Sequence, residues 1–245
     1  MKSRTKRKVR LALVALPVVA AAGTAAFLMT RGDDVHHTTH VALVDQTSFG
    51  ANHQLDLEAT RRLTAVASAA AADKGQLIVV DIGGDTLSTR VEGTVSFNPD
   101  CANPDTCRKA DKAALNGAAT LIGKVVSENQ GAQSTDLFGA LNLAGSICHE
   151  QQGSCQLDVI SDGDQNDQEL SLLGDIPNGA ATTTLIEHHR AGARLPDLSN
   201  VTITWSGLGT DGGTSDRTAA LAGFWNQYLT AAGANSIDIS RAVTK

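Results

Sequence analysis

The stretch of sequence that decides the fold spans residues 41–48 and reads VALVDQTS. Four apolar residues in a row predict a short strand that is buried on both faces. The strand ends at an acid, Asp45, and the hydroxyl residues Thr47 and Ser48 follow closely. In a parallel α/β sheet, groups at the carboxyl ends of the strands gather at one crevice, where such folds bind ligands. Asp45 is therefore a candidate ligand-binding residue.

A second strand-like run ends in the same way far along the chain. Residues 157–160 read LDVI and lead through Ser161 into Asp162. Between the two runs, the segment at 134–136 reads STD and opens a helical stretch, with Thr135 at its centre. Two carboxylates and several hydroxyls that converge on one sheet edge form an all-oxygen site. Such a site suits Mg²⁺ or a similar hard ion.

Strands and helices alternate along the rest of the chain. We expect strands at 40–45, 76–81, 89–97, 156–161, 201–205 and 236–239, and helices at 55–74, 108–129, 137–147, 180–193 and 214–232. The run at 89–97 alternates apolar and polar residues, which favours an edge strand. The alternation of elements predicts a doubly wound, mostly parallel, Rossmann-like α/β sheet with helices on both faces. Residues 40–242 would form one such domain.

The first 39 residues have a different character. Residues 1–10 are strongly basic, and residues 11–30 carry no charge. About 20 apolar residues at a rise of 1.5 Å span roughly the 30 Å hydrocarbon core of a bilayer. We therefore expect a cytoplasmic tail at 1–10, a transmembrane signal-anchor at 11–30 and a stalk at 31–39, with the domain outside the cytoplasm at the cell membrane. The alternative is a signal peptide cleaved near the small residues at 20–22, which would yield a secreted protein.

Beyond the basic tail, the chain is acidic. Six of the twenty Lys and Arg residues lie in the tail, which leaves fourteen against 26 Asp and Glu, a net charge of −12. This balance argues against nucleic acid and against anionic lipid heads as partners. Aromatic residues make up only 3% of the chain. Because aromatic side chains dominate hydrophobic binding hot spots, their scarcity favours polar or metal-bridged recognition.

Four cysteines support export from the cytoplasm. Cys101 and Cys107 lie close together in sequence, as do Cys148 and Cys155, and neither pair has CxxC spacing. In an oxidising compartment, an even number of cysteines in loop-like segments predicts two disulfides. Three pairings are possible, and we favour the two local ones.

The three polar segments together resemble the metal site of the von Willebrand factor A (vWA) family. In that family, a DxSxS loop after the first strand, a Thr before a central helix and an Asp after the fourth strand form the metal-ion-dependent adhesion site. Asp45, Thr47, Thr135 and Asp162 match these positions, and the order of elements matches across residues 40–240.

The vWA resemblance implies a binding or adhesion module rather than an enzyme. A Mg²⁺ ion (or Mn²⁺ or Ca²⁺) at this site would engage an acidic group of a protein partner. Ser48 and Asp136 are further candidate ligands.

One position departs from the family pattern and keeps alternatives open. Phe49 stands where the family has a second Ser, and phenylalanine cannot coordinate a metal. A vWA-like scaffold that binds its partner without metal is therefore an alternative. In a second alternative, Asp45 and Asp162 only cap helices or bind loop amides. A third alternative is a nucleotide-binding enzyme, based on GLGTDG at 207–212. We expect a simple glycine-rich turn at these residues instead.

The acids at 162–167 begin like an EF-hand loop. The pattern fails because Asp167 and Leu173 stand where such a loop needs Gly and Glu. We expect these acids to lie in a solvated loop beside the metal site.

Overall fold

The computed structural model describes residues 37–45, 53–85, 87–97, 103–127, 134–151, 153–210 and 213–241, without the side chains of residues 53–56, 240 and 241. The predicted tail and anchor, most of the predicted stalk, and Thr47, Ser48, Phe49 and Cys101 lie outside these residues. Within the described ranges, no helix is long and apolar enough to cross a membrane.

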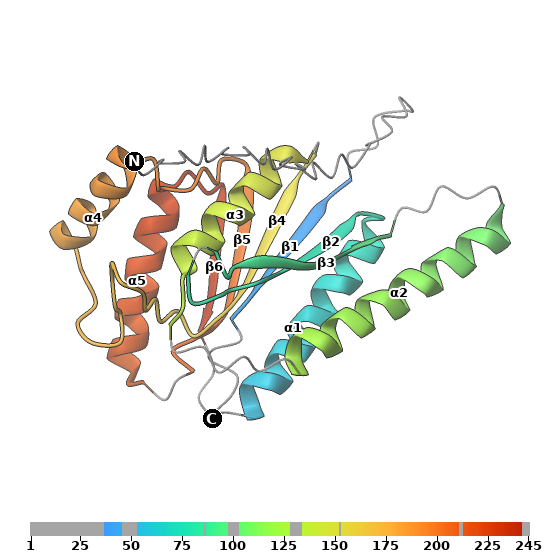
Figure 1. Ribbon diagram of the computed structural model, residues 1–245, viewed down its shortest axis with the longest axis horizontal. Helices are drawn as coiled ribbons and strands as arrows, with labels where there is room; N and C mark the ends of the chain where they lie inside the picture. The colour runs from blue at the N-terminus through green and yellow to red at the C-terminus, as the bar shows by residue number, and fades with distance from the viewer. Residues whose placement is uncertain are drawn as a thin grey trace, which may run out of the picture. The chain divides into compact units, whose positions relative to one another are not determined.

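Strands and helices alternate as predicted (Figure 1). The strands are β1 Thr39–Val44, β2 Gln76–Asp81, β3 Arg90–Ser96, β4 Cys155–Ile160, β5 Val201–Leu208 and β6 Ser236–Arg241. The helices are α1 His53–Ala72, α2 Pro104–Ser127, α3 Leu137–Glu150, α4 Ala180–Ala191 and α5 Ser215–Ala231.

The strands form one mixed sheet in the order β3-β2-β1-β4-β5-β6. All neighbouring strands are parallel except β3, which runs antiparallel to β2 at the edge. The prediction of a mostly parallel sheet with an edge strand near residues 89–97 is confirmed. The strand order reverses direction between β1 and β4, which are central neighbours with Val44 opposite Ile160. Such a reversal is the usual place for a ligand in an open α/β sheet.

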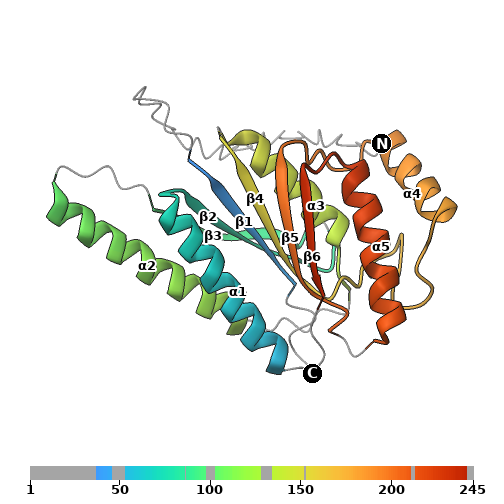
Figure 2. The ribbon, with the colours of Figure 1, turned by 180° about the vertical axis from the view of Figure 1, so that it is seen from behind.

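Helices cover both faces of the sheet, as expected for a doubly wound fold. Side chains alternate along a strand, so Val41 and Leu43 enter one core while Ala42 and Val44 enter the other. The first core is closed by α3, α4 and α5, and the second by α1 and α2. The two groups of helices are separated by the sheet in both ribbon views (Figures 1 and 2).

Helix α5 buries one apolar stripe against the sheet. Its buried residues are Leu221, Phe224, Trp225, Tyr228 and Leu229, which recur at the i, i+3, i+4, i+7 and i+8 positions of an amphipathic helix. This periodicity explains why the helix was visible in the sequence.

Every aromatic residue in the described ranges is buried. On the α5 side, the rings of Trp205 and Trp225 lie 4.9 Å apart, and Phe138 of α3 lies 4.8 Å from Tyr228. Aromatic pairs at such distances add stability beyond their buried area. The aromatic residues of the described ranges therefore stabilise the interior.

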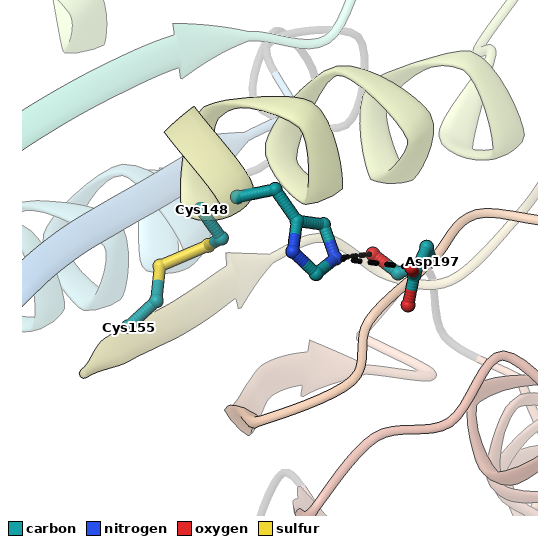
Figure 3. The surroundings of a disulfide bond; sticks show 4 residues. Cys148, Cys155 and Asp197 are labelled. Carbon is teal, nitrogen blue, oxygen red and sulfur yellow. Dashed lines mark hydrogen bonds and ion pairs between the residues drawn. A yellow bond between two sulfur atoms is a disulfide. The ribbon is translucent and has the colours of Figure 1, made fainter. Parts of the chain in front are cut away.

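A disulfide joins the end of α3 to the start of β4. Cys148 bonds to Cys155, which confirms one of the two local pairings (Figure 3). Nearby, His149 Nε2 lies 3.3 Å from a carboxylate oxygen of Asp197, a residue that Figure 3 shows on a neighbouring segment. A Cβ at Gly145 would lie 2.6 Å from the Asp197 carbonyl oxygen, so only glycine fits where this segment approaches α3.

Two cysteines lie in helices rather than in the predicted loops. Cys148 lies in α3, which extends to Glu150, and Cys107 lies in α2 and is also disulfide-bonded. Helix α2 begins at Pro104, earlier than predicted, because Asn103 caps it. The Asn103 side-chain oxygen accepts hydrogen bonds from the Asp105 and Thr106 amides, and proline suits the first helical position.

Replacing Cys148 and Cys155 together by Ser should lower the free energy of unfolding by about 2–3 kcal/mol, because the bond closes a short loop in the unfolded chain. The measurement is urea unfolding of the full-length protein without reductant. An unchanged urea midpoint would show that this disulfide does not stabilise the fold.

The carboxylate of Asp158 lies on the face of the sheet that packs against α1. It lies opposite Ala42 in the β1–β4 register and therefore shares its face. Burial raises the pKa of Asp158 to about 6, while the charges of His40 and Arg62 act in the opposite direction. The folded protein thus holds this proton more tightly than the unfolded chain, whose pKa is near 3.8. The stability that this proton contributes is therefore fully present below pH 3.8 and is lost as the pH rises through 6.

Asp158→Asn should therefore raise the free energy of unfolding by about 1–3 kcal/mol at pH 8 and leave it unchanged below pH 4. Urea unfolding at both pH values measures the difference. Asp238→Asn, at an exposed position on β6, is the control and should show no such pH dependence. An equal gain at both pH values would contradict the assigned role of burial.

Candidate functional site

Asp45 lies at the carboxyl end of β1, where the strand order reverses. It is fully buried, and its backbone N–H donates to the Ile160 carbonyl at the end of β4, over 3.0 Å. One carboxylate oxygen of Asp45 accepts a hydrogen bond of 2.7 Å from the Ser161 hydroxyl. Ser161 was not among the predicted site residues, although it directly precedes one of them. We call the edge that contains Asp45 and residues 83–85, 87–89, 134–136 and 161–174 the carboxyl edge.

The two buried tryptophans hold the loop after β4. The indole N–H of Trp205 donates to the Ser161 carbonyl over 3.0 Å, and that of Trp225 donates to the Gly163 carbonyl over 2.9 Å. Gly163 has φ +87°, and a Cβ there would lie 2.3 Å from Leu208. The position of Asp162, between these two carbonyls, is therefore fixed by the aromatic core.

Asp162 is half-buried and forms a local turn. Its carboxylate accepts a hydrogen bond of 2.9 Å from the Asp164 amide, and its carbonyl accepts one of 2.9 Å from Gly209. The first contact is of the loop-amide kind considered as an alternative to metal binding. Gly207 and Gly209 both have positive φ, and a Cβ at Gly209 would lie 2.2 Å from Thr218. These glycines allow β5 to turn tightly into α5.

Thr135 lies between two other segments of the carboxyl edge. Its backbone exchanges hydrogen bonds of 2.9 and 3.0 Å with Asn166, and the next amide, of Asp136, donates to the Gly83 carbonyl over 2.9 Å. Thr135 and Asp136 are both buried. The Asp136 carboxylate caps α3 by accepting a hydrogen bond of 2.8 Å from the Gly139 amide. Asp136 therefore has a structural role at the start of the helix.

Gln165 forms a second cap on α3. Its side chain is fully buried, and its oxygen accepts hydrogen bonds of 2.7 and 3.3 Å from the Leu137 and Phe138 amides. These amides belong to the first turn, where helices leave N–H groups without intrahelical partners. No sequence signal identified Gln165, because the residue meets the helix from 28 positions away.

The acids at 162–167 do not all lie in a solvated loop, contrary to expectation. Asp164 is buried and forms an ion pair with Arg217 of α5. Arg217 also donates to the carbonyls of Leu172 and Gly174. Asp167 accepts hydrogen bonds from the Glu169 and Leu170 amides. Burial is tolerated at Asp164 because a guanidinium offsets its charge.

The carboxyl edge brings together three of the predicted metal ligands. Asp45, Thr135 and Asp162 lie on segments that are hydrogen-bonded through Ile160, Ser161 and Asn166. In the described part of the chain, no group of three His, Cys, Asp or Glu side chains could hold a metal ion. Two carboxylates with hydroxyls nevertheless fit Mg²⁺, which needs few carboxylates and keeps several waters. Thr47 and Ser48 would have to complete this set.

No known family model and no curated protein matches this sequence. Among solved structures, the SpRpn10 VWA domain is similar, with a TM-score of 0.43 and 10% identity over 84% of this chain and 88% of that one. The pilus adhesin SpaC from Lactobacillus rhamnosus GG has a TM-score of 0.45 and 11% identity, over 86% of this chain and 28% of that one. Proximal thread matrix protein 1 of the mussel byssus has a TM-score of 0.42 and 11% identity, over 84% of this chain and 44% of that one.

This chain thus spans less than half of the adhesin and of the byssus protein. The function proposed below rests on the geometry of the carboxyl edge.

Gln165→Leu should destabilise the protein by about 2–4 kcal/mol, because two buried amides of α3 lose their acceptor at roughly 1–3 kcal/mol each. Urea unfolding of the full-length protein measures the loss. Gln227→Leu is the control, since it removes only an exposed hydrogen bond to Thr183 and should cost less than about 1 kcal/mol. Equal costs for the two variants would show that Gln165 is not an essential cap.

Proposed function

We propose that this protein is a binding module that engages a protein partner at the carboxyl edge through a divalent cation. Asp45, Thr135 and Asp162 would hold Mg²⁺ or Mn²⁺, together with Thr47 and Ser48 from the loop after β1. The bound ion would supply a positive centre that accepts an acidic side chain of the partner. The residues of this chain would position the ion and restrict access to it.

The placement of Asp45 and Asp162 at the reversal of strand order carries this proposal. Helix α1 follows β1 and packs on one face of the sheet, whereas α4 follows β4 and belongs to the opposite face. The connections therefore diverge at the ends of β1 and β4, which is where an open α/β sheet usually binds its ligand. Carboxylates and hydroxyls at this point favour a hard cation over a nucleotide phosphate. Gly207 and Gly209 serve the turn between β5 and α5, so these glycines do not call for a bound nucleotide.

A metal-free scaffold is the alternative that a specific observation favours. The Ser161 hydroxyl and the Asp164 amide donate to the carboxylates of Asp45 and Asp162, so these acids also have structural roles. Phe49 in place of the expected second Ser would reduce the number of ligands. In that case, the same edge would bind its partner through polar contacts alone.

We place the module outside the cytoplasm, held at the membrane by the apolar segment at 11–30. The Cys148–Cys155 bond and the disulfide at Cys107 support an oxidising compartment, because such bonds are rare in the cytosol. Protease protection in intact cells tests this location. Loss of the domain on external protease treatment is expected, and full protection would contradict it.

Mn²⁺ should bind the full-length protein saturably. Asp45→Asn should weaken that binding at least tenfold, which corresponds to about 1.4 kcal/mol of binding free energy. Asparagine can still accept the hydrogen bond from Ser161, so the substitution removes charge while leaving this contact available. Isothermal titration with MnCl₂ and MgCl₂ measures the affinity.

Asp238→Asn is the matched control, because it removes one exposed carboxylate from β6 and should leave the affinity unchanged. Saturable binding that survives Asp45→Asn, or no saturable binding in the unsubstituted protein, would favour the metal-free scaffold.

A further inference from the structure

We propose that Leu87 and Leu173 form an apolar rim around the candidate cation site and contact the partner there. The inference rests on the proposed function and extends it to the chemistry of the partner. That partner would be a protein segment that offers a carboxylate to the cation and apolar side chains to the two leucines.

Two exposed leucines lie at the carboxyl edge. The large apolar residues that are exposed in the described ranges are Leu57, Leu87, Val91, Leu115 and Leu173. Leu57, Val91 and Leu115 lie on α1, β3 and α2, whereas Leu87 and Leu173 belong to the carboxyl edge. Single exposed leucines are common on protein surfaces, but two of them on loops that flank one polar site favour an interface.

Leu87 and Leu173 lie on segments that flank Thr135 on opposite sides. On one side, the Asp136 amide donates to the Gly83 carbonyl, and a Cβ at Gly84 would lie 2.4 Å from the Ser134 hydroxyl oxygen. The turn that follows displays Leu87. On the other side, Asn166 bridges both Thr135 and Ser171. Leu173 follows two residues after this second bridge.

The turn around Leu87 is held by hydrogen bonds rather than by burial of its tip. Leu87 is 96% exposed. The carboxylate of Asp85 accepts a hydrogen bond of 2.8 Å from the Ser88 amide, and the Ser88 hydroxyl donates back to the Asp85 carbonyl. Hydrogen bonds from the Ser88 backbone amide and side chain to the carboxylate lower the pKa of Asp85. A fixed turn loses little conformational freedom on binding, which favours a role in recognition.

Leu173 is displayed by a second fixed segment. It is 59% exposed, whereas its neighbour Leu172 is fully buried. The guanidinium of Arg217 donates to the carbonyls on both sides of Leu173, those of Leu172 and Gly174, over 2.7 and 3.2 Å. The Leu172 amide donates to the Gln165 carbonyl over 2.8 Å. The backbone is thus held while the leucine side chain points to solvent.

The chemistry of the edge selects a peptide segment as the occupant. A cation between Asp45 and Asp162 would accept an acidic ligand in place of a water molecule, and two leucines on separate loops suit apolar groups on either side of it. A protein segment carries an acid and flanking apolar side chains on one backbone. Every aromatic residue in the described ranges is buried, so among the described residues of this edge the exposed large apolar side chains are these leucines.

A phage-displayed library of random 12-residue peptides, selected on the full-length protein in Mg²⁺, tests the proposal. The enriched peptides should contain Asp or Glu flanked by large apolar residues. Leu87→Ser and Leu173→Ser should each weaken the binding of the synthesised peptides by about tenfold. Leu115→Ser, which removes an exposed leucine outside the carboxyl edge, should change it less than twofold. The three variants should have the same urea midpoint as the unsubstituted protein, because each side chain is exposed.

The outcomes separate the rim from the cation. If EDTA and Asp45→Asn abolish peptide binding while both leucine variants bind normally, the rim is overturned and the proposed function stands. If the leucine variants lose binding and EDTA has no effect, the rim stands and the metal-dependent function fails. Failure to enrich any peptide, or an equal loss in Leu115→Ser, overturns the rim.

Discussion

The parallel pairing of β1 with β4 is the constraint on which the rest of the structure depends. It sets Val44 opposite Ile160, so that the next residues, Asp45 and Ser161, meet at the carboxyl edge. It also creates the reversal of strand order that sends α1 to one face of the sheet and α3, α4 and α5 to the other. A slip of one residue in this register would exchange the two faces of β4 and move Asp158 into the aromatic core.

The carboxyl edge collects several carboxylates, and their mutual repulsion must be offset. Arg217 offsets the charge of Asp164. The first turn of α3 offsets that of Asp136, because the positive end of the helix dipole favours an acid. The second cap, Gln165, is neutral and adds no further negative charge. In the proposed function, a divalent cation would offset Asp45 and Asp162 in the same way.

Local patterns explain what the sequence alone could predict. Continuous apolar runs predicted β1 and β2, a helical stripe predicted α5, and the acids directly after two strands were correctly placed at the carboxyl edge. Short spacing also indicated the Cys148–Cys155 bond. Each of these features depends on a few neighbouring residues or on a general rule of sheet topology.

The contacts that fix the edge could not be predicted, because they join residues far apart in the chain. Gln165 reaches α3 from 28 positions away, and Arg217 reaches Asp164 from 53. Ser161 meets Asp45 only once the strand register is known. The start of α2 was missed for a different reason, since the Asn103 cap lies in a segment that resembles a loop.

The aromatic core and the carboxyl edge are physically one unit. Trp205 and Trp225 are buried, yet both use their indole N–H groups to hold the carbonyls on either side of Asp162. A change in the packing of these rings would therefore move Asp162, a candidate metal ligand, although the rings themselves would not contact a bound ion. The aromatic residues thus position the loop that carries Asp162 from inside the protein. In the proposed module, direct contact with a partner would be left to the polar groups and the exposed leucines of the edge.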